Sequence, residues 1–124
     1  MKLILKHIII NANPNIYGKY KIEEKDIIDG DFHFSVDIGV GIDDNTDSFD
    51  LFSFQLISFK KIQKDLEKDQ IIFGGRYMIV EKFEYKNIIE KITHIIESIE
   101  CDTWEEYVIE LRLFFSWEYE LGMH

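Results

Sequence analysis

The feature that most constrains the fold is a regular alternation of apolar and polar residues between positions 31 and 42. The apolar residues are Phe32, Phe34, Val36, Ile38, Val40 and Ile42, and every intervening position is polar or glycine. Because successive side chains of a strand point to opposite faces of a sheet, this pattern predicts a strand with one buried face. Such a strand needs a sheet, and a layer that covers one face of that sheet.

Further strands are predicted on both sides of this segment. Residues 49–58 follow an acidic turn and are rich in aromatic residues, so they are expected to form an antiparallel hairpin with residues 31–42. Residues 2–10 and 76–83 are also predicted to be strands. Residues 11–18 are predicted to form a loop around Pro14, whereas the composition of residues 19–30 fits a short helix or an extended segment equally well.

Helical spacing is found in three places. Phe59, Ile62 and Leu66 predict a short helix. A longer apolar stripe consists of Ile88, Ile89, Ile92, Ile95, Ile96 and Ile99, and the next one consists of Trp104, Tyr107, Val108, Leu111 and Phe115. Thr103 and Glu106 predict a capping box at the start of the last helix. Strands first and helices last predict an α+β fold, in which two C-terminal helices pack on one face of an antiparallel sheet of four to five strands.

Length and composition predict one soluble domain over residues 1–124. The chain has one cysteine, Cys101, so a disulfide within the chain is impossible, and this fits the reducing cytoplasm. The apolar N-terminus is interrupted by Lys2, Lys6 and His7 and lacks a small-residue cleavage site, so we expect a strand there instead of a signal peptide.

Charge is distributed unevenly along the chain, which has a net charge of −10. Residues 1–22 carry +4, residues 23–50 carry −9, residues 51–96 carry +2 and residues 97–124 carry −7. A chain with two such acidic segments is expected to repel nucleic acid and anionic membranes, and to attract basic partners. Acidity that serves only solubility is the competing interpretation.

Two short motifs resemble ligand-binding loops and fail the chemical requirements of those loops. Asp43, Asn45 and Asp47 are spaced like the start of a calcium loop, but Ser48 and Phe54 replace the required glycine and bidentate glutamate. Gly39 and Gly41 resemble part of a dinucleotide-binding motif, but they lie within the predicted strand 31–42. We expect a polar turn at the first motif, and a bulge or close backbone approach at the second.

No arrangement of residues in the sequence indicates catalysis. The four histidines, His7, His33, His94 and His124, are too far apart in the chain for a local metal site. Cys101 has no histidine base nearby in the sequence and is expected to be structural, and no pair of carboxylates is distinguished by its spacing. We therefore expect no catalytic residues, no metal and no cofactor.

Four stretches between residues 31 and 120 are distinctive in their order and spacing. The first contains Phe32-His33-Phe34 and Ile38-Gly39, and the second is Asp47-Ser48-Phe49-Asp50-Leu51. The third is Gly75-Arg76-Tyr77-Met78-Ile79-Val80. The most specific comprises Ile96-Glu97-Ser98-Ile99, Asp102-Thr103-Trp104-Glu105-Glu106 and Trp117-Glu118-Tyr119. Together these stretches resemble the immunity protein 8 family of bacterial polymorphic toxin systems. The resemblance implies a non-enzymatic protein that binds a cognate toxin domain in the cytoplasm, often a nuclease with a basic substrate groove.

Three functions remain open at this point. The chain is an immunity protein that neutralises a toxin by binding it, an enzyme that uses dispersed carboxylates, or an acidic interaction module or subunit unrelated to toxins. For the first function, carboxylates that imitate phosphates would attract the basic toxin. The candidate toxin-binding residues are Asp43, Asp44, Asp47 and Asp50, which have no base among them in the sequence, and the secondary candidates are Glu105 and Glu110.

Overall fold

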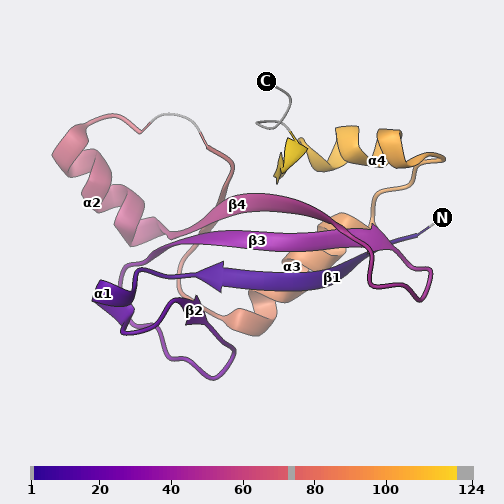
Figure 1. Ribbon diagram of the computed structural model, residues 1–124. Coiled ribbons are helices and arrows are strands. Elements are labelled where there is room, and N and C mark those ends of the chain that lie inside the picture. Colours follow the sequence, from indigo (N-terminus) through magenta and orange to yellow (C-terminus); the bar gives the residue numbers. More distant parts are fainter. Residues whose placement is uncertain (1, 73–74, 120–124) are drawn as a thin grey trace.

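The computed structural model describes residues 2–72 and 75–119 and has an α+β fold, as predicted (Figure 1). The strands are β1 (Leu3–Asn11), β2 (Lys21–Ile22), β3 (His33–Ile42), β4 (Asp50–Ser58), β5 (Tyr77–Val80) and β6 (Ser116–Trp117). The helices are α1 (Pro14–Tyr17), α2 (Phe59–Asp69), α3 (Tyr85–Glu97) and α4 (Trp104–Leu111). None of these helices is both long and apolar enough to cross a membrane.

The sheet has the strand order β2-β1-β3-β4-β5, and β6 pairs with β4 on the same side as β5. The predicted β3–β4 hairpin is confirmed, with Val36 opposite Phe54. The expectation of an antiparallel sheet is wrong for one pair, because β4 and β5 run parallel. Parallel neighbours need a crossover, and α2 lies within the connection that returns the chain to the start of β5. The two-residue strands β2 and β6 were not predicted.

The alternation in β3 separates the core from the opposite face of the sheet. Phe34, Val36, Ile38 and Val40 are fully buried, whereas His33 and Ser35 are exposed. Their partners on β4 continue the buried face with Phe52, Phe54 and Leu56. Burial of each such side chain stabilises the fold by about 1.5–3 kcal/mol. The alternation of apolar residues along β3 therefore determines which face of the sheet is buried.

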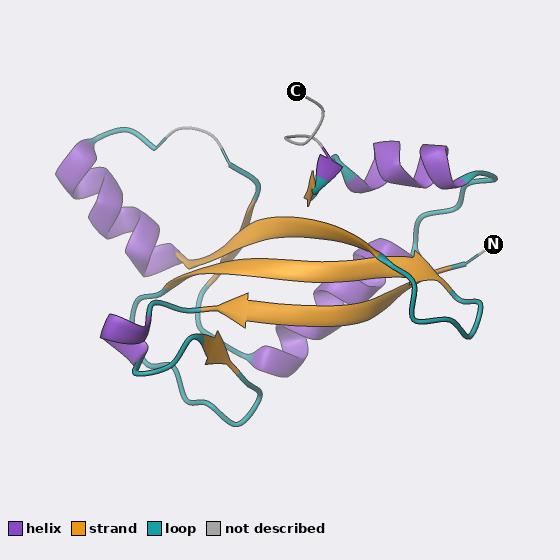
Figure 2. Ribbon diagram, in the orientation of Figure 1, coloured by secondary structure: helices purple, strands orange, loops and turns teal. Residues whose placement is uncertain are grey.

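Helices α3 and α4 add their apolar stripes to the same core. Figure 2 shows α3 crossing one face of the sheet. Ile88, Ile92 and Ile96 of α3 are buried, and α3 packs against β1 on one face of the sheet. Tyr107, Val108 and Leu111 are the buried residues of α4. Trp104, from the predicted stripe of the last helix, and Trp117 both pack against this core while remaining half-buried.

Residues 11–30 and helix α2 contribute few residues to the core. The predicted loop contains the short helix α1, which Asn13 caps by accepting a hydrogen bond from the Asn15 amide at 2.9 Å. Residues 19–30 are mostly irregular, with β2 paired to β1. Helix α2 is capped by the buried Ser58, whose hydroxyl accepts from the Lys61 amide at 3.2 Å. Its apolar residues Phe59 and Leu66 are exposed, so the helical spacing was correct but does not mark a buried face.

Candidate functional site

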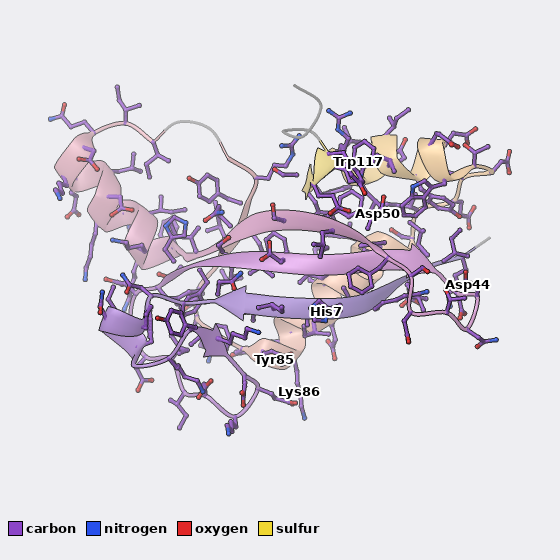
Figure 3. The ribbon with its side chains drawn as sticks, viewed as in Figure 1. His7, Asp44, Asp50, Tyr85, Lys86 and Trp117 are labelled. Atoms are coloured by element: carbon purple, nitrogen blue, oxygen red, sulfur yellow. The ribbon has the colours of Figure 1, made fainter. Side chains whose placement is uncertain are left out.

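The acidic loop between β3 and β4 is hydrogen-bonded to residues at the end of the sheet. The Asp43 amide donates to the Lys2 carbonyl at 2.9 Å, and the Asp44 amide donates to the Ile42 carbonyl at 2.9 Å. In Figure 3, Asp44 lies at the end of the sheet where this loop connects the two strands. The loop therefore has a defined conformation, as expected for a loop presented by two strongly patterned strands.

Lys6 braces the loop from the neighbouring strand. β1 has a register shift between Leu5 and His7, at the position of Lys6, whose side chain is only 9% exposed. Its ammonium group donates to the Asp44 carboxylate at 3.2 Å and to the Thr46 carbonyl at 2.7 Å. No base lies among the four aspartates in the sequence, but Lys6 supplies one to Asp44 from a distant segment of the chain.

Asp44 is a structural residue of the loop. Its Oδ1 atom accepts from the Thr46 hydroxyl at 2.7 Å, from the Thr46 amide at 3.1 Å and from Lys6. The two Thr46 donors, followed by Lys6, lower the pKa of the Asp44 carboxyl to about 2. Asp44 thus holds the loop together, and it is a poorer candidate for an intermolecular contact than its neighbours.

Asp50 also has an internal partner. The indole N–H of Trp117 donates to the Asp50 carboxylate at 3.2 Å, and Figure 3 places these two side chains next to each other. The adjacent Leu51 amide donates to the Glu118 carboxylate at 3.0 Å, and the Glu118 amide donates to the Leu51 carbonyl at 3.0 Å. Asp50 therefore helps to attach β6 to β4.

Asp43 and Asp47 are the two candidates whose carboxylates remain available. Both are exposed, and within the described residues no hydrogen bond or ion pair involves their side chains. They line a hollow of about 430 Å³ together with Ile4, Lys6, His7, Asn45, Thr46 and Phe49. Phe49 is 41% exposed and stacks on the His7 ring, with 5.6 Å between the ring centroids. The hollow thus combines two free carboxylates with an aromatic wall.

The two glycines of β3 allow this arrangement. A Cβ atom at Gly39 would lie 2.5 Å from the Phe49 ring, and one at Gly41 would lie 2.4 Å from the Ser48 carbonyl oxygen. This confirms the interpretation of close approach, and it explains why these positions are buried although they are not on the core face.

The secondary candidates lie on α4. Glu105 and Glu110 are exposed, and within the described residues neither forms a hydrogen bond or an ion pair with the β3–β4 loop. The capping box is confirmed for Thr103, whose hydroxyl accepts from the Glu106 amide at 3.2 Å. The Glu106 carboxylate accepts from the Asp102 amide at 3.2 Å instead of the expected Thr103 amide.

Sequence reasoning missed an apolar groove beside β5. The groove has a volume of about 580 Å³ and lies between β5, α3 and the segment that leads to β6. Residues 76–83 were predicted as a strand, but neither the pairing of β5 with β4 nor the packing of α3 and Phe115 beside it was predicted.

No group of three or more metal-ligating side chains lies together among the described residues; His124 lies outside them. Burial raises the pKa of the Cys101 thiol, and the nearby carboxylates of Glu106, Glu110 and Asp102 raise it further. A raised pKa disfavours the nucleophilic thiolate at neutral pH.

The chain was compared with protein families, with curated proteins and with solved structures. The family model described as immunity protein 8 matches residues 5–121, which include the β3–β4 loop, α4 and the groove beside β5. No curated protein and no solved structure matches the chain.

Proposed function

The chain belongs to the immunity protein 8 family, and from this premise we propose that it neutralises its cognate toxin by binding it directly, without catalysis. The observation that carries the proposal is the family match over residues 5–121. Immunity proteins of this kind act against a toxin, and a direct complex is the simplest way for a small domain to block a toxin's active site or substrate surface.

We further propose that the toxin domain is basic, as expected of a nuclease with a groove for a polyanion. The chain's net charge of −10 supports this choice, because opposite charges accelerate association. Asp43 and Asp47 are the proposed contacts in the β3–β4 loop. An arginine of the toxin could form charge-assisted hydrogen bonds with these carboxylates and stack on Phe49.

The proposed place of action is the cytoplasm. The single cysteine supports this proposal, because the fold needs no disulfide and therefore no oxidising compartment. Fractionation of cells that express the chain at its natural level would test it, with the chain expected in the cytoplasmic fraction.

A titration separates binding from catalysis. The probe is the toxin domain encoded next to this chain's gene, identified first by co-expression and rescue from growth arrest. If the chain acts by binding, toxin activity falls linearly with added chain and reaches zero at about one equivalent, independent of incubation time. An enzyme would abolish toxin activity below one equivalent, with a loss that grows with time. An acidic module unrelated to toxins would give neither inhibition nor rescue.

A further inference from the structure

Strand β5 has one free edge. Within the described residues it pairs only with β4, and the pairing is parallel. The Gln55 amide donates to the Arg76 carbonyl at 2.8 Å, which fixes the direction of the backbone groups. Because these groups alternate along a strand, those of Met78 and Val80 face β4, whereas the N–H and C=O groups of Tyr77 and Ile79 face outward.

The outward edge is bordered by apolar surface on both faces of the sheet. Tyr77 is 38% exposed and Ile79 is 55% exposed, and both lie on the face opposite the core. On the other face, the groove of about 580 Å³ is lined by Phe54, Met78, Val80, Ile88, Ile95 and Phe115, among other residues. Phe114, which is 46% exposed, forms part of the same wall.

The free backbone groups of β5 and the apolar side chains beside them are suited to binding the same kind of partner segment. Unpaired N–H and C=O groups in a row are satisfied by another extended backbone, which adds a strand to the sheet. Side chains of an added strand alternate between the two faces, so every second one would point toward the groove. An extended peptide segment with apolar residues at alternate positions fits this edge.

The charge of the chain distinguishes between two sources of such a segment. A second copy would bring together two molecules of net charge −10, and their mutual repulsion opposes association. A basic protein is attracted by the same charge. Glu81 and Glu84 line the groove together with Lys82 and Lys91, so their charges cancel there and the attraction comes from the net charge of the whole chain.

We propose that the cognate toxin docks by adding an extended segment to the free edge of β5, with alternate apolar side chains in the adjacent groove. This inference rests on the proposed function and specifies how the toxin is held. The edge supplies backbone hydrogen bonds that recognise an extended conformation, and the groove supplies apolar burial.

Proline substitution tests the edge without removing a bond to β4. Ile79→Pro deletes one outward N–H group, and proline is tolerated at the solvent side of an edge strand. Ile79→Ala is the matched control, since it removes most of the side chain and keeps the amide. With circular dichroism and melting temperature checked for both variants, Ile79→Pro is expected to bind the toxin domain about tenfold more weakly than Ile79→Ala.

Amide hydrogen exchange of the unmodified chain tests the same edge and does not depend on the folding of any variant. In the free chain, the amides of Tyr77 and Ile79 should exchange faster than those of Met78 and Val80, and bound toxin should slow them strongly. Failure of the wild-type chain to bind the toxin overturns the proposed function itself. Binding without this protection, or equal binding by the two Ile79 variants, overturns only the edge inference. Protection that rises with chain concentration in the absence of toxin would assign the edge to a second copy and overturn the inference.

Discussion

The β3–β4 loop and the β5 edge are both borders of the sheet, but their polar groups are satisfied differently. In the loop, Lys6 and Thr46 satisfy Asp44, so a braced turn presents the free carboxylates of Asp43 and Asp47. At β5 the free groups belong to the backbone and are surrounded by apolar side chains. Charge acts over a distance of about a Debye length, roughly 8 Å, whereas hydrogen bonds and apolar burial need contact. The loop is therefore suited to guide association, and the edge to slow dissociation.

The largest predicted difference between the two regions is in stability. Phe54 lies at the floor of the groove, is 3% exposed and packs on Phe115 with 5.5 Å between ring centroids. Phe54→Ala should lower the free energy of unfolding by about 3–5 kcal/mol because it leaves a cavity in the core. Phe49→Ala at the loop should cost less than about 1 kcal/mol, as for most exposed positions. Urea denaturation measures both values. Equal losses would mean that the wall of the loop hollow is part of the core.

The next prediction concerns Trp117, whose indole is bonded to Asp50 at the start of β4. Trp117→Ala should cost less than the ~3–5 kcal/mol of a fully buried tryptophan, because this residue is half-buried. Trp117→Phe keeps most of the apolar contact and should cost about 1 kcal/mol for the lost hydrogen bond.

A double-mutant cycle of Trp117→Phe with Asp50→Ala isolates that bond. No coupling between the two substitutions would contradict the assignment of Asp50 to the attachment of β6. If Trp117→Ala kept normal stability and lost toxin binding, Trp117 would belong to the interface instead of the core.

Features that depend on a local sequence pattern could be predicted, whereas contacts between residues distant in the chain could not. The alternation of β3 and the isoleucine stripe of α3 could be read from the sequence because each depends on the geometry of one element. The partners of Asp44 and Asp50 could not, because Lys6 and Trp117 lie 38 and 67 residues away in the chain. Asp43, Asp44 and Asp47 lie in the predicted turn and Asp50 at the entry of the next strand, but these four candidates could not be ranked without the contacts.

The groove beside β5 was missed for a related reason. The strand itself was predicted, and the helix at 59–69 was predicted in part. The connection through that helix implies a crossover, and a crossover permits parallel pairing with β4. That step was available from the sequence, whereas the free edge and the groove depend on the packing of α3 and Phe115.

A smaller effect is predicted for charge reversal, and it distinguishes the loop from α4. Asp43→Lys with Asp47→Lys should slow toxin association about tenfold at low salt, equivalent to about 1.4 kcal/mol, and change the melting temperature by only a few degrees. Asp44 is left intact in this test because its substitution would disturb the brace formed by Lys6. The matched control is Glu105→Lys with Glu110→Lys, which changes the net charge equally. Stopped-flow association at two salt concentrations measures both. Equal slowing would indicate a diffuse field, and no slowing by the loop pair would remove the loop from the interface.

The smallest predicted effect is the pH dependence of the loop brace. The pKa of the folded Asp44 carboxyl is about 2, below the ordinary value of 3.8, because Thr46 and then Lys6 favour its charged form. A lowered folded pKa stabilises the protein above pH 3.8, and this contribution is lost as the pH falls from about 4 to about 2. Asp44→Asn should therefore flatten the fall in melting temperature across that window. Asp43→Asn is the control, since it removes the same charge one residue away from the brace, and the contribution of Asp26, whose pKa is also lowered, is present in both variants. If both variants flattened the curve equally, general charge repulsion and not the Lys6–Asp44–Thr46 contacts would account for the acid sensitivity.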